Sequence, residues 1–177
     1  MSESHDLRAP EDWVQRHMPM IPNSGAVLDL AAGRGRHSRL LLAAGYKVTA
    51  ADRDISGLAG LEGVRSVETD LEAEPWPFRA AEFAGVVVVN YLHRPLIGHL
   101  IDALADGGVL IYQTFAAGNE AYGRPKNPDF LLRPGELLDA FTPALAVIAY
   151  QHGIIHGPEP AVIQRIAAIK SDAPQSI

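Results

Sequence analysis

Short apolar runs alternate with segments of helical periodicity along most of the chain. The apolar runs predict seven strands, which are Val27–Leu30, Lys47–Asp52, Val64–Thr69, Gly85–Val89, Val109–Phe115, Ala144–Gln151 and Ala161–Ile169. Between them we expect a helix that starts near Ile55 and the helices Pro10–His17, Ser38–Ala44, Leu96–Leu104 and Pro134–Phe141. This alternation is typical of an α/β fold with a mostly parallel sheet flanked by helices.

The valine run Gly85–Val89 predicts a central parallel strand that is buried on both faces. Polar residues follow it at once, beginning with Asn90. Ligands of open α/β sheets bind beyond the carboxyl ends of the strands, so we expect the site at this edge.

A turn of small residues follows the first predicted strand, and Gly33 and Gly35 allow positive φ angles there. The dinucleotide fingerprint would require a third glycine where this chain has Ser38. A buried carboxylate at Asp29 is unfavourable unless it meets a positive group, such as the ammonium or sulfonium of S-adenosylmethionine. The alternative is that Asp29 only caps the loop and the glycines only turn the chain.

Two further acids end the next two strands. Asp52 is placed to accept hydrogen bonds from vicinal ribose hydroxyls, or else to cap the helix near Ile55. Asp70, followed by the apolar Leu71, ends the third strand.

The spacing Asp29-x-Ala31-x-Gly33-x-Gly35 resembles the acidic-glycine motif of class I S-adenosylmethionine-dependent methyltransferases. The stretch up to Asp52 is similar to small bacterial tellurite-resistance-type methyltransferases, and the resemblance extends over roughly residues 13–170. It implies a Rossmann-like methyltransferase fold with a seven-stranded sheet and an antiparallel C-terminal strand pair. It also implies that Asp70 and Leu71 read the adenine edge. The expected cofactor-binding residues are Asp29, Ala31, Gly33, Gly35, Asp52, Arg53, Asp70, Leu71 and Asn90.

The reaction that follows is in-line methyl transfer from S-adenosyl-L-methionine to a small-molecule acceptor. Methyl transfer depends mainly on alignment, so a dedicated base is optional. If the acceptor must lose a proton, Tyr91 and His93 are the candidate catalytic residues, and a purely structural role for His93 is the alternative.

Residues 116–134 form a loop too long for a simple connection, and its apolar residues favour an anchored lid over a disordered insertion. Its expected substrate contacts are Asn119, Tyr122 and Arg124. Trp13, before the first strand, is either a plug of the core or a lid over the ligands, and we favour the plug.

The length of 177 residues predicts one methyltransferase domain, residues 1–177, with disordered tails at about residues 1–8 and 171–177. The net charge of −6 argues against a nucleic-acid partner. The absence of cysteine excludes disulfides and thiolate metal sites. His152 and His156 lie on an apparent strand, too far apart to share a metal, so no metal is expected.

No apolar run is long enough to span a membrane, and the first residues are polar and acidic, so we expect a cytoplasmic protein. The oligomeric state stays open.

Three arginines near the glycine turn form a solvated face or the mouth of a pocket for an anionic substrate, and they are Arg34, Arg36 and Arg39. Two rival functions stay open as well, an NAD(P)-dependent reductase and a non-catalytic nucleoside-binding protein of the same fold.

Overall fold

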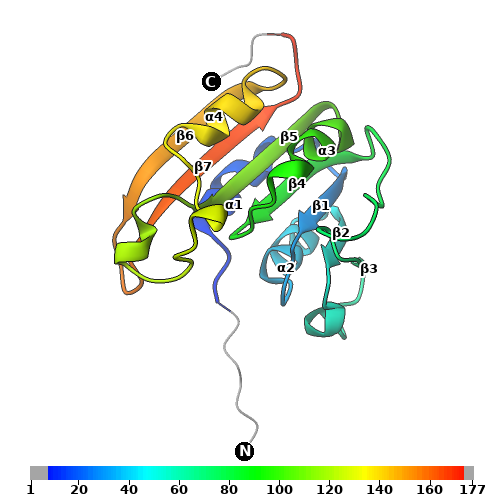
Figure 1. The fold of residues 1–177 in the computed structure, drawn as a ribbon. Helices are drawn as coiled ribbons and strands as arrows, with labels where there is room; N and C mark the ends of the chain where they lie inside the picture. Colours follow the sequence, from blue (N-terminus) through cyan, green and yellow to red (C-terminus); the bar gives the residue numbers. More distant parts are fainter. Residues whose placement is uncertain (1–7, 174–177) are drawn as a thin grey trace, which may run out of the picture.

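The computed structural model describes residues 8–173, and its strands form one seven-stranded sheet. The strands are β1 (Ala26–Leu30), β2 (Lys47–Asp52), β3 (Val64–Glu68), β4 (Phe83–Val89), β5 (Leu104–Phe115), β6 (Ala146–Ile155) and β7 (Ala161–Ile169). Their order across the sheet is β3-β2-β1-β4-β5-β7-β6 (Figure 1). β1 to β5 are parallel, whereas β7 is antiparallel to both β5 and β6. The predicted fold class, including the antiparallel C-terminal pair, is confirmed.

Helices cover both faces of the sheet (Figure 1). They are α1 (Asp12–His17), α2 (Arg36–Ala43), α3 (Ile97–Ala103) and α4 (Glu136–Phe141). Helices α1 and α2 pack on one face, and α3 and α4 pack on the other. Five 3-10 turns join the elements, at Met18–Met20, Ile55–Leu58, Arg94–Leu96, Asn119–Ala121 and Pro128–Phe130.

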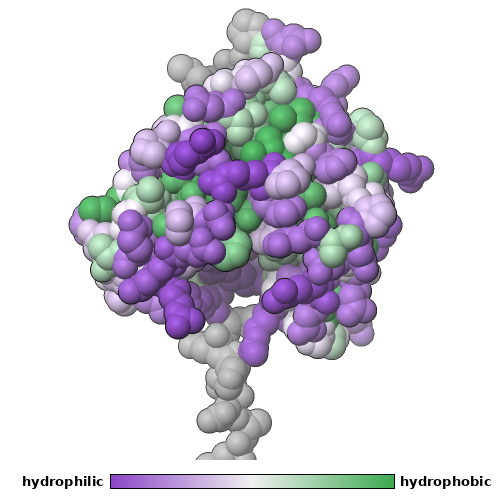
Figure 2. Space-filling model, in the orientation of Figure 1, coloured by the Kyte–Doolittle hydropathy of each residue, from purple (hydrophilic) through white to green (hydrophobic). Residues whose placement is uncertain are grey.

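The valines of β4 show why this strand is central. Val86 and Val88 belong to the hydrophobic core under α3 and α4, and Val87 and Val89 belong to the core under α1 and α2. Successive side chains of a strand point to opposite faces, so a continuous run of valines serves both cores. Figure 2 shows hydrophilic residues over most of one face of the molecule, with apolar residues gathered in the region of α3 and α4.

Trp13 is a core residue rather than a lid, because only 1% of it is exposed. Its indole Nε1 donates a hydrogen bond to the carbonyl of Ile166 in β7 at 3.2 Å. The guanidinium of Arg165 lies 4.6 Å from the ring centroid. Helix α1 is therefore bonded to strand β7, and the plug interpretation is confirmed.

Three predicted elements are corrected by the structure. The helix near Ile55 is only the 3-10 turn Ile55–Leu58. β6 starts later than predicted and runs on to Ile155, because Gly153 still pairs with Ile163 of β7. β5 begins at Leu104 rather than at the predicted Val109, and a register shift against β4 between Phe83 and Gly85 accommodates the additional residues.

The order of the strands reverses between β1 and β4, which are neighbours although two strands separate them in sequence. Ligands of such sheets bind beyond the carboxyl ends of the strands at this point. The loop after β5 and the segment that precedes α1 both lie at this end (Figure 1).

The predicted tails fall outside the described residues except for residues 8 and 171–173, and Arg8 forms an ion pair with Glu159 at 3.0 Å. Within the described range, no helix is both long and apolar enough to cross a membrane.

Candidate functional site

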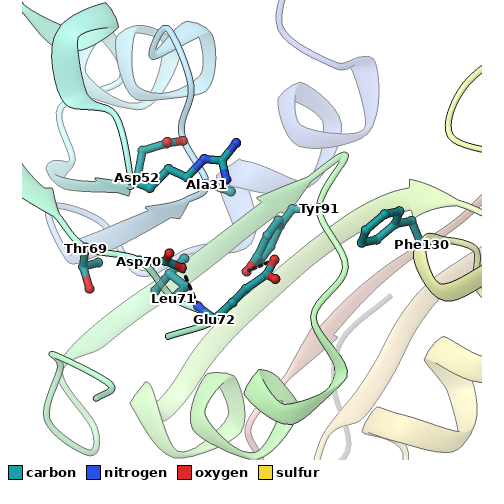
Figure 3. Close-up of a pocket in the computed structure, with 9 residues that line it drawn as sticks. Ala31, Asp52, Thr69, Asp70, Leu71, Glu72, Tyr91 and Phe130 are labelled. Carbon is teal, nitrogen blue, oxygen red and sulfur yellow. Dashed lines mark hydrogen bonds between the residues drawn. The ribbon is translucent and has the colours of Figure 1, made fainter. Parts of the chain in front are cut away.

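A cavity of about 430 Å³ opens at the carboxyl ends of β1 to β4 (Figure 3). Its volume falls in the range of small-molecule sites. The structure brings together five of the expected cofactor residues and one expected catalytic residue here. The full lining is Ala31, Asp52, Arg53, Thr69, Asp70, Leu71, Glu72, Tyr91 and Phe130. We call it the first cavity.

Asp52 is fixed by backbone hydrogen bonds at the end of β2. The amide N–H of Gly33 donates to its Oδ2 at 2.8 Å, and the amide N–H of Asp54 donates to its Oδ1 at 3.1 Å. The alternative role as a cap belongs to Asp54, whose Oδ1 accepts from the N–H of Ser56 in the 3-10 turn. Asp52 is therefore tied to the glycine turn and faces the cavity.

The glycine turn has the backbone that its sequence predicts. Gly33 and Gly35 have φ angles of 54° and 74°. A Cβ on Gly33 would meet nothing within 4 Å, whereas one on Gly35 would lie 2.8 Å from Cδ2 of Leu58. Gly33 thus leaves space open beside the turn, and Gly35 is required for packing against the following 3-10 turn.

Two residues other than glycine also have positive φ near the switch point. Ala31 follows β1 with φ of 54°, and Asn90 follows β4 with φ of 56°. Such backbone is unfavourable for residues with a side chain and is found preferentially at functional sites. The amide N–H of Asn90 donates to the carbonyl of Gln113, which fixes this bend.

Asp29 lies below the turn and is almost fully buried, with 2% exposed. The hydroxyl of Ser38 in the first turn of α2 donates to its Oδ2 at 2.6 Å. Burial raises the pKa of Asp29 to about 6, although the hydrogen bonds from Ser38 partly oppose this shift. Asp29 is therefore bonded to helix α2 rather than to the residues of the glycine turn. Its contact with a cofactor stays a prediction.

Tyr91 projects into the first cavity, where its hydroxyl lies 3.5 Å from Oε1 of Glu72 (Figure 3). Burial, followed by the negative charge of Glu72, raises the pKa of Tyr91. The carbonyl of Tyr91 accepts a hydrogen bond from the hydroxyl of the buried Tyr112 at 2.7 Å. Tyr91 is thus held in place as a neutral phenol, which can donate a hydrogen bond but is a poor base.

A second cavity of about 470 Å³ lies beside Asn90. It collects four further expected contacts, Asn90, Asn119, Tyr122 and Arg124, whereas Asp29, Gly33, Gly35 and His93 line neither cavity. Its other walls come from the segment before α1, from β5 and the loop after it, and from the end of β6 through β7. These residues are Arg8, Glu11, Gln113, Phe115, Gly123, Ile155, Pro158, Glu159, Pro160, Ala161 and Ile163. We call it the second cavity.

Glu11 ties the N-terminal segment across this cavity. Its carboxylate accepts from Arg36 Nη2 and from Gln113 Nε2, both at 2.9 Å. Its amide N–H donates to Nε2 of His37, the residue after Arg36. Burial lowers the pKa of His37 to about 4, so the ring is neutral and can accept this bond. Arg36 therefore belongs to an ion pair rather than to an open cationic face.

Asn119 is almost fully buried, and both ends of its amide are engaged. Its Oδ1 accepts from the N–H of Val162 at 3.1 Å, and its Nδ2 donates to the carbonyl of Pro125 at 3.3 Å. These bonds anchor the loop to β7. The loop 116–134 is thus an anchored segment with two 3-10 turns. Of its apolar residues, Leu131 and Leu132 are buried, whereas Tyr122 and Phe130 are exposed. Its function as a lid stays a prediction.

His93 is not among the residues that line the first or the second cavity in the described chain. Its backbone carbonyl accepts from the N–H of Leu96 in the 3-10 turn before α3, but its side chain does not cap that turn. The catalytic role of His93 and its structural alternative both stay predictions. Residues 8–173 contain no group of three His, Asp or Glu side chains arranged to hold a metal ion.

Sequence reasoning missed Glu72 and Phe130 in the first cavity and Glu11 and Gln113 in the second. Glu72 follows Leu71 directly, so proximity to the predicted adenine-reading pair could have indicated it. Glu11 and Gln113 are 102 positions apart, and no local pattern indicates their hydrogen bond.

The sheet order, the glycine turn and the cavity beside it define the class: this is the fold of Rossmann-like class I methyltransferases. The family model described as "Tellurite resistance protein TehB" matches residues 14–107, slightly more than half of the chain. The chain belongs to the TehB family, which confirms the resemblance seen in the sequence.

Solved structures share this fold. TehB from Haemophilus influenzae is 19% identical with a TM-score of 0.76, over 94% of this chain and 64% of that one. The 1,6-didemethyltoxoflavin-N1-methyltransferase of Burkholderia thailandensis, solved with its substrate and S-adenosylhomocysteine, is 20% identical with a TM-score of 0.69, over 90% and 77% of the two chains. The N-methyltransferase NodS from Bradyrhizobium japonicum is 13% identical with a TM-score of 0.67, over 89% and 96%.

This chain thus spans about two thirds of the length of the Haemophilus protein. No curated protein matches it in sequence.

Proposed function

We propose that the chain binds S-adenosyl-L-methionine in the first cavity and transfers its methyl group to a small-molecule acceptor. The observation that carries the proposal is the convergence of Asp52 and Asp70 on one cavity beside the glycine turn. The family and the S-adenosylhomocysteine bound to the similar Burkholderia methyltransferase support the same cofactor.

The residues present fit a cationic nucleoside ligand. Three carboxylates line the first cavity, on Asp52, Asp70 and Glu72, against one guanidinium on Arg53. Asp29 adds a buried carboxyl, and the positive charge of a cationic ligand nearby would stabilise its ionised form. An acidic lining favours a ligand with a sulfonium and an ammonium over a dinucleotide with a pyrophosphate.

Asp52 and Asp70 have separate tasks in this proposal. Asp52 receives the ribose hydroxyls with the lone pairs that Gly33 and Asp54 leave free. Asp70 and Leu71 read the adenine edge, and Asn90 contacts the methionine portion. Gly33 keeps its side of the turn open for the close approach of the ligand.

When bound, S-adenosylmethionine would supply an electrophilic methyl group to a lone pair of the acceptor, with the thioether of S-adenosylhomocysteine as the leaving group. The chain contributes by holding both partners in line. Tyr91 acts as a hydrogen-bond donor beside the reacting atoms, since its raised pKa keeps its proton in place. An acceptor that must lose a proton needs another base, and His93 reaches neither cavity without a rearrangement.

The second cavity is the proposed acceptor site, with Tyr122 and Arg124 as its contacts. Its volume of about 470 Å³ suits a small molecule rather than a polymer. A cytoplasmic location and the absence of a nucleic-acid partner stay predictions.

Titration calorimetry tests the proposal. S-adenosylhomocysteine should bind with a micromolar or tighter dissociation constant, about −8 kcal/mol, and NAD should give no comparable signal. Tight binding of NAD in place of S-adenosylhomocysteine would support the reductase. Incubation of a metabolite panel with methyl-labelled cofactor then identifies the acceptor, and failure of every acceptor with intact cofactor binding supports the non-catalytic nucleoside-binding protein.

A further inference from the structure

One aromatic ring in the first cavity comes from an unexpected part of the chain. Phe130 belongs to the loop after β5, which the sequence assigns to the acceptor. Its ring nevertheless lines the same cavity as Asp52 and Tyr91, and lies on the far side of Tyr91 from Asp52 (Figure 3). The ring is also one of three large apolar side chains exposed in the described residues, with 48% of Phe130 exposed.

The two residues next to Phe130 in the chain are held by one guanidinium. Arg94 Nη1 donates to the carbonyl of Asp129 at 2.8 Å, and Arg94 Nη2 donates to the carbonyl of Leu131 at 3.0 Å. Asp129 precedes Phe130 and Leu131 follows it. Arg94 begins the 3-10 turn that follows β4, so it connects the Phe130 segment to the end of the central strand.

A buried carboxylate holds this guanidinium in place. Arg94 Nε donates to Glu136 Oε1 at 2.6 Å and Nη2 to Oε2 at 3.1 Å, while the side chain of Glu136 is only 8% exposed. Oε2 also accepts from the N–H of Arg133 at 2.7 Å. A bidentate pair of this kind fixes orientation as well as distance. Leu131 and Leu132 are buried directly after the ring, which anchors the segment further.

The backbone around Phe130 is therefore rigid, whereas its ring is left in solvent at the rim of a cavity. Exposure of so large an apolar ring is unfavourable, and a ligand in the cavity would remove part of it from water. We infer that Phe130 is a binding residue that contacts the cofactor in the first cavity, and that Arg94 and Glu136 are positioning residues that hold it there. This inference rests on the proposed function and adds a contact from outside the matched segment 14–107.

The first test measures S-adenosylhomocysteine affinity by calorimetry for the unmodified chain and for Phe130→Ala. Loss of the ring should weaken binding about fivefold, since part of an aromatic burial is removed. Ile154→Ala is the matched control, because Ile154 has a similar exposure of 46% but lines neither the first nor the second cavity. Its affinity should stay within twofold. Unchanged affinity in Phe130→Ala overturns the inference.

The second test separates positioning by Arg94 from a general structural role. Arg94→Lys keeps the charge but cannot bond both carbonyls and the carboxylate with the same geometry. It should weaken S-adenosylhomocysteine binding about threefold in the unmodified chain and not at all in the Phe130→Ala background. Thermal stability should fall equally in both backgrounds. An equal loss of affinity in both backgrounds would show that Arg94 does not act through Phe130.

Asp52→Ala distinguishes failure of this inference from failure of the proposed function. If the unmodified chain does not bind S-adenosylhomocysteine, both are wrong. If Asp52→Ala weakens binding and Phe130→Ala does not, the cofactor assignment stands and only the role of Phe130 and Arg94 is wrong.

Discussion

The two cavities lie side by side at one edge of the sheet but are built in different ways. The first cavity is formed mainly by residues that directly follow consecutive parallel strands, and its key contact between Gly33 and Asp52 joins positions 19 apart. The second is assembled from four separate parts of the chain, and its contact between Glu11 and Gln113 joins positions 102 apart. Most of the first cavity falls within the family match, whereas most of the second falls outside it.

Under the proposed function, this difference separates cofactor binding from acceptor choice along the chain. The ends of neighbouring parallel strands lie together regardless of the loops, so the first cavity follows from the fold itself. The second cavity also needs the loop after β5, the segment before α1 and the connection between β6 and β7, and such segments vary more readily than the sheet. Changes in the first cavity should alter cofactor affinity, and changes in the second should alter transfer.

The largest expected effect concerns the buried carboxyl beneath the first cavity. Below about pH 4, Asp29 is protonated in both the folded and the unfolded chain, so it gives the free energy of unfolding no pH dependence there. Between about pH 4 and 6, the unfolded chain ionises first, so the free energy of unfolding falls with rising pH, by about 3 kcal/mol in total, and is constant above. Urea unfolding at several pH values should show this fall in the unmodified chain relative to Asp29→Asn. A parallel pH dependence in both proteins would contradict it.

Asp52 provides the next largest effect. Asp52→Ala removes charge-assisted hydrogen bonds to the ribose, so S-adenosylhomocysteine affinity should fall at least tenfold, or about 1.5 to 3 kcal/mol. Asp54→Ala is the matched control, because it removes the cap of the 3-10 turn without removing a cavity residue. Calorimetry on both variants, with circular dichroism to verify folding, measures the difference. Equal losses of affinity would return Asp52 to a structural role.

Asn119 tests whether the second cavity is independent of the first. Asn119→Ala leaves the buried N–H of Val162 without its acceptor, which should lower the free energy of unfolding by about 1 to 2 kcal/mol. Asn127→Ala, which removes an exposed cap in the same loop, should have a smaller effect. S-adenosylhomocysteine affinity should stay within twofold in Asn119→Ala, and a larger change would couple the two cavities.

The smallest expected change in cofactor affinity belongs to the exposed contacts of the second cavity. The double variant Tyr122→Ala and Arg124→Ala should bind S-adenosylhomocysteine within twofold of the unmodified chain, since neither residue lines the first cavity. Transfer from labelled cofactor to the identified acceptor should fall. Full transfer activity in this variant would remove the loop from the acceptor site.

The parts of the molecule that could be predicted from the sequence are those fixed by local chemistry. The valine run of β4, the acids at the ends of β2 and β3, and the glycines after β1 each indicate their own position. Parallel pairing then brings these strand ends together without further information. Trp13 could be placed in the core because a large aromatic ring at the start of an amphipathic helix has a strong tendency to be buried.

The parts that could not be predicted depend on contacts distant in sequence or on a choice between similar local structures. The rim position of Phe130 follows from Arg94 and Glu136, which are 42 positions apart. Nothing in the apolar pattern distinguishes a ring at a cavity rim from one in a core. Likewise, a glycine such as Gly153 favours the end of a strand when only its neighbours in sequence are considered. Its pairing with Ile163 of β7 keeps it within β6.

The position of β7 has a consequence for how the chain is made. β7 is synthesised after β6, yet it lies between β5 and β6, so β6 can join the sheet only once β7 has left the ribosome. The indole N–H of Trp13 in helix α1 also obtains its acceptor only then, because it donates to the carbonyl of Ile166. A nascent chain that stalls before Ala161 therefore presents the unpaired edge of β5 and a partnerless β6, two surfaces prone to pair with other chains.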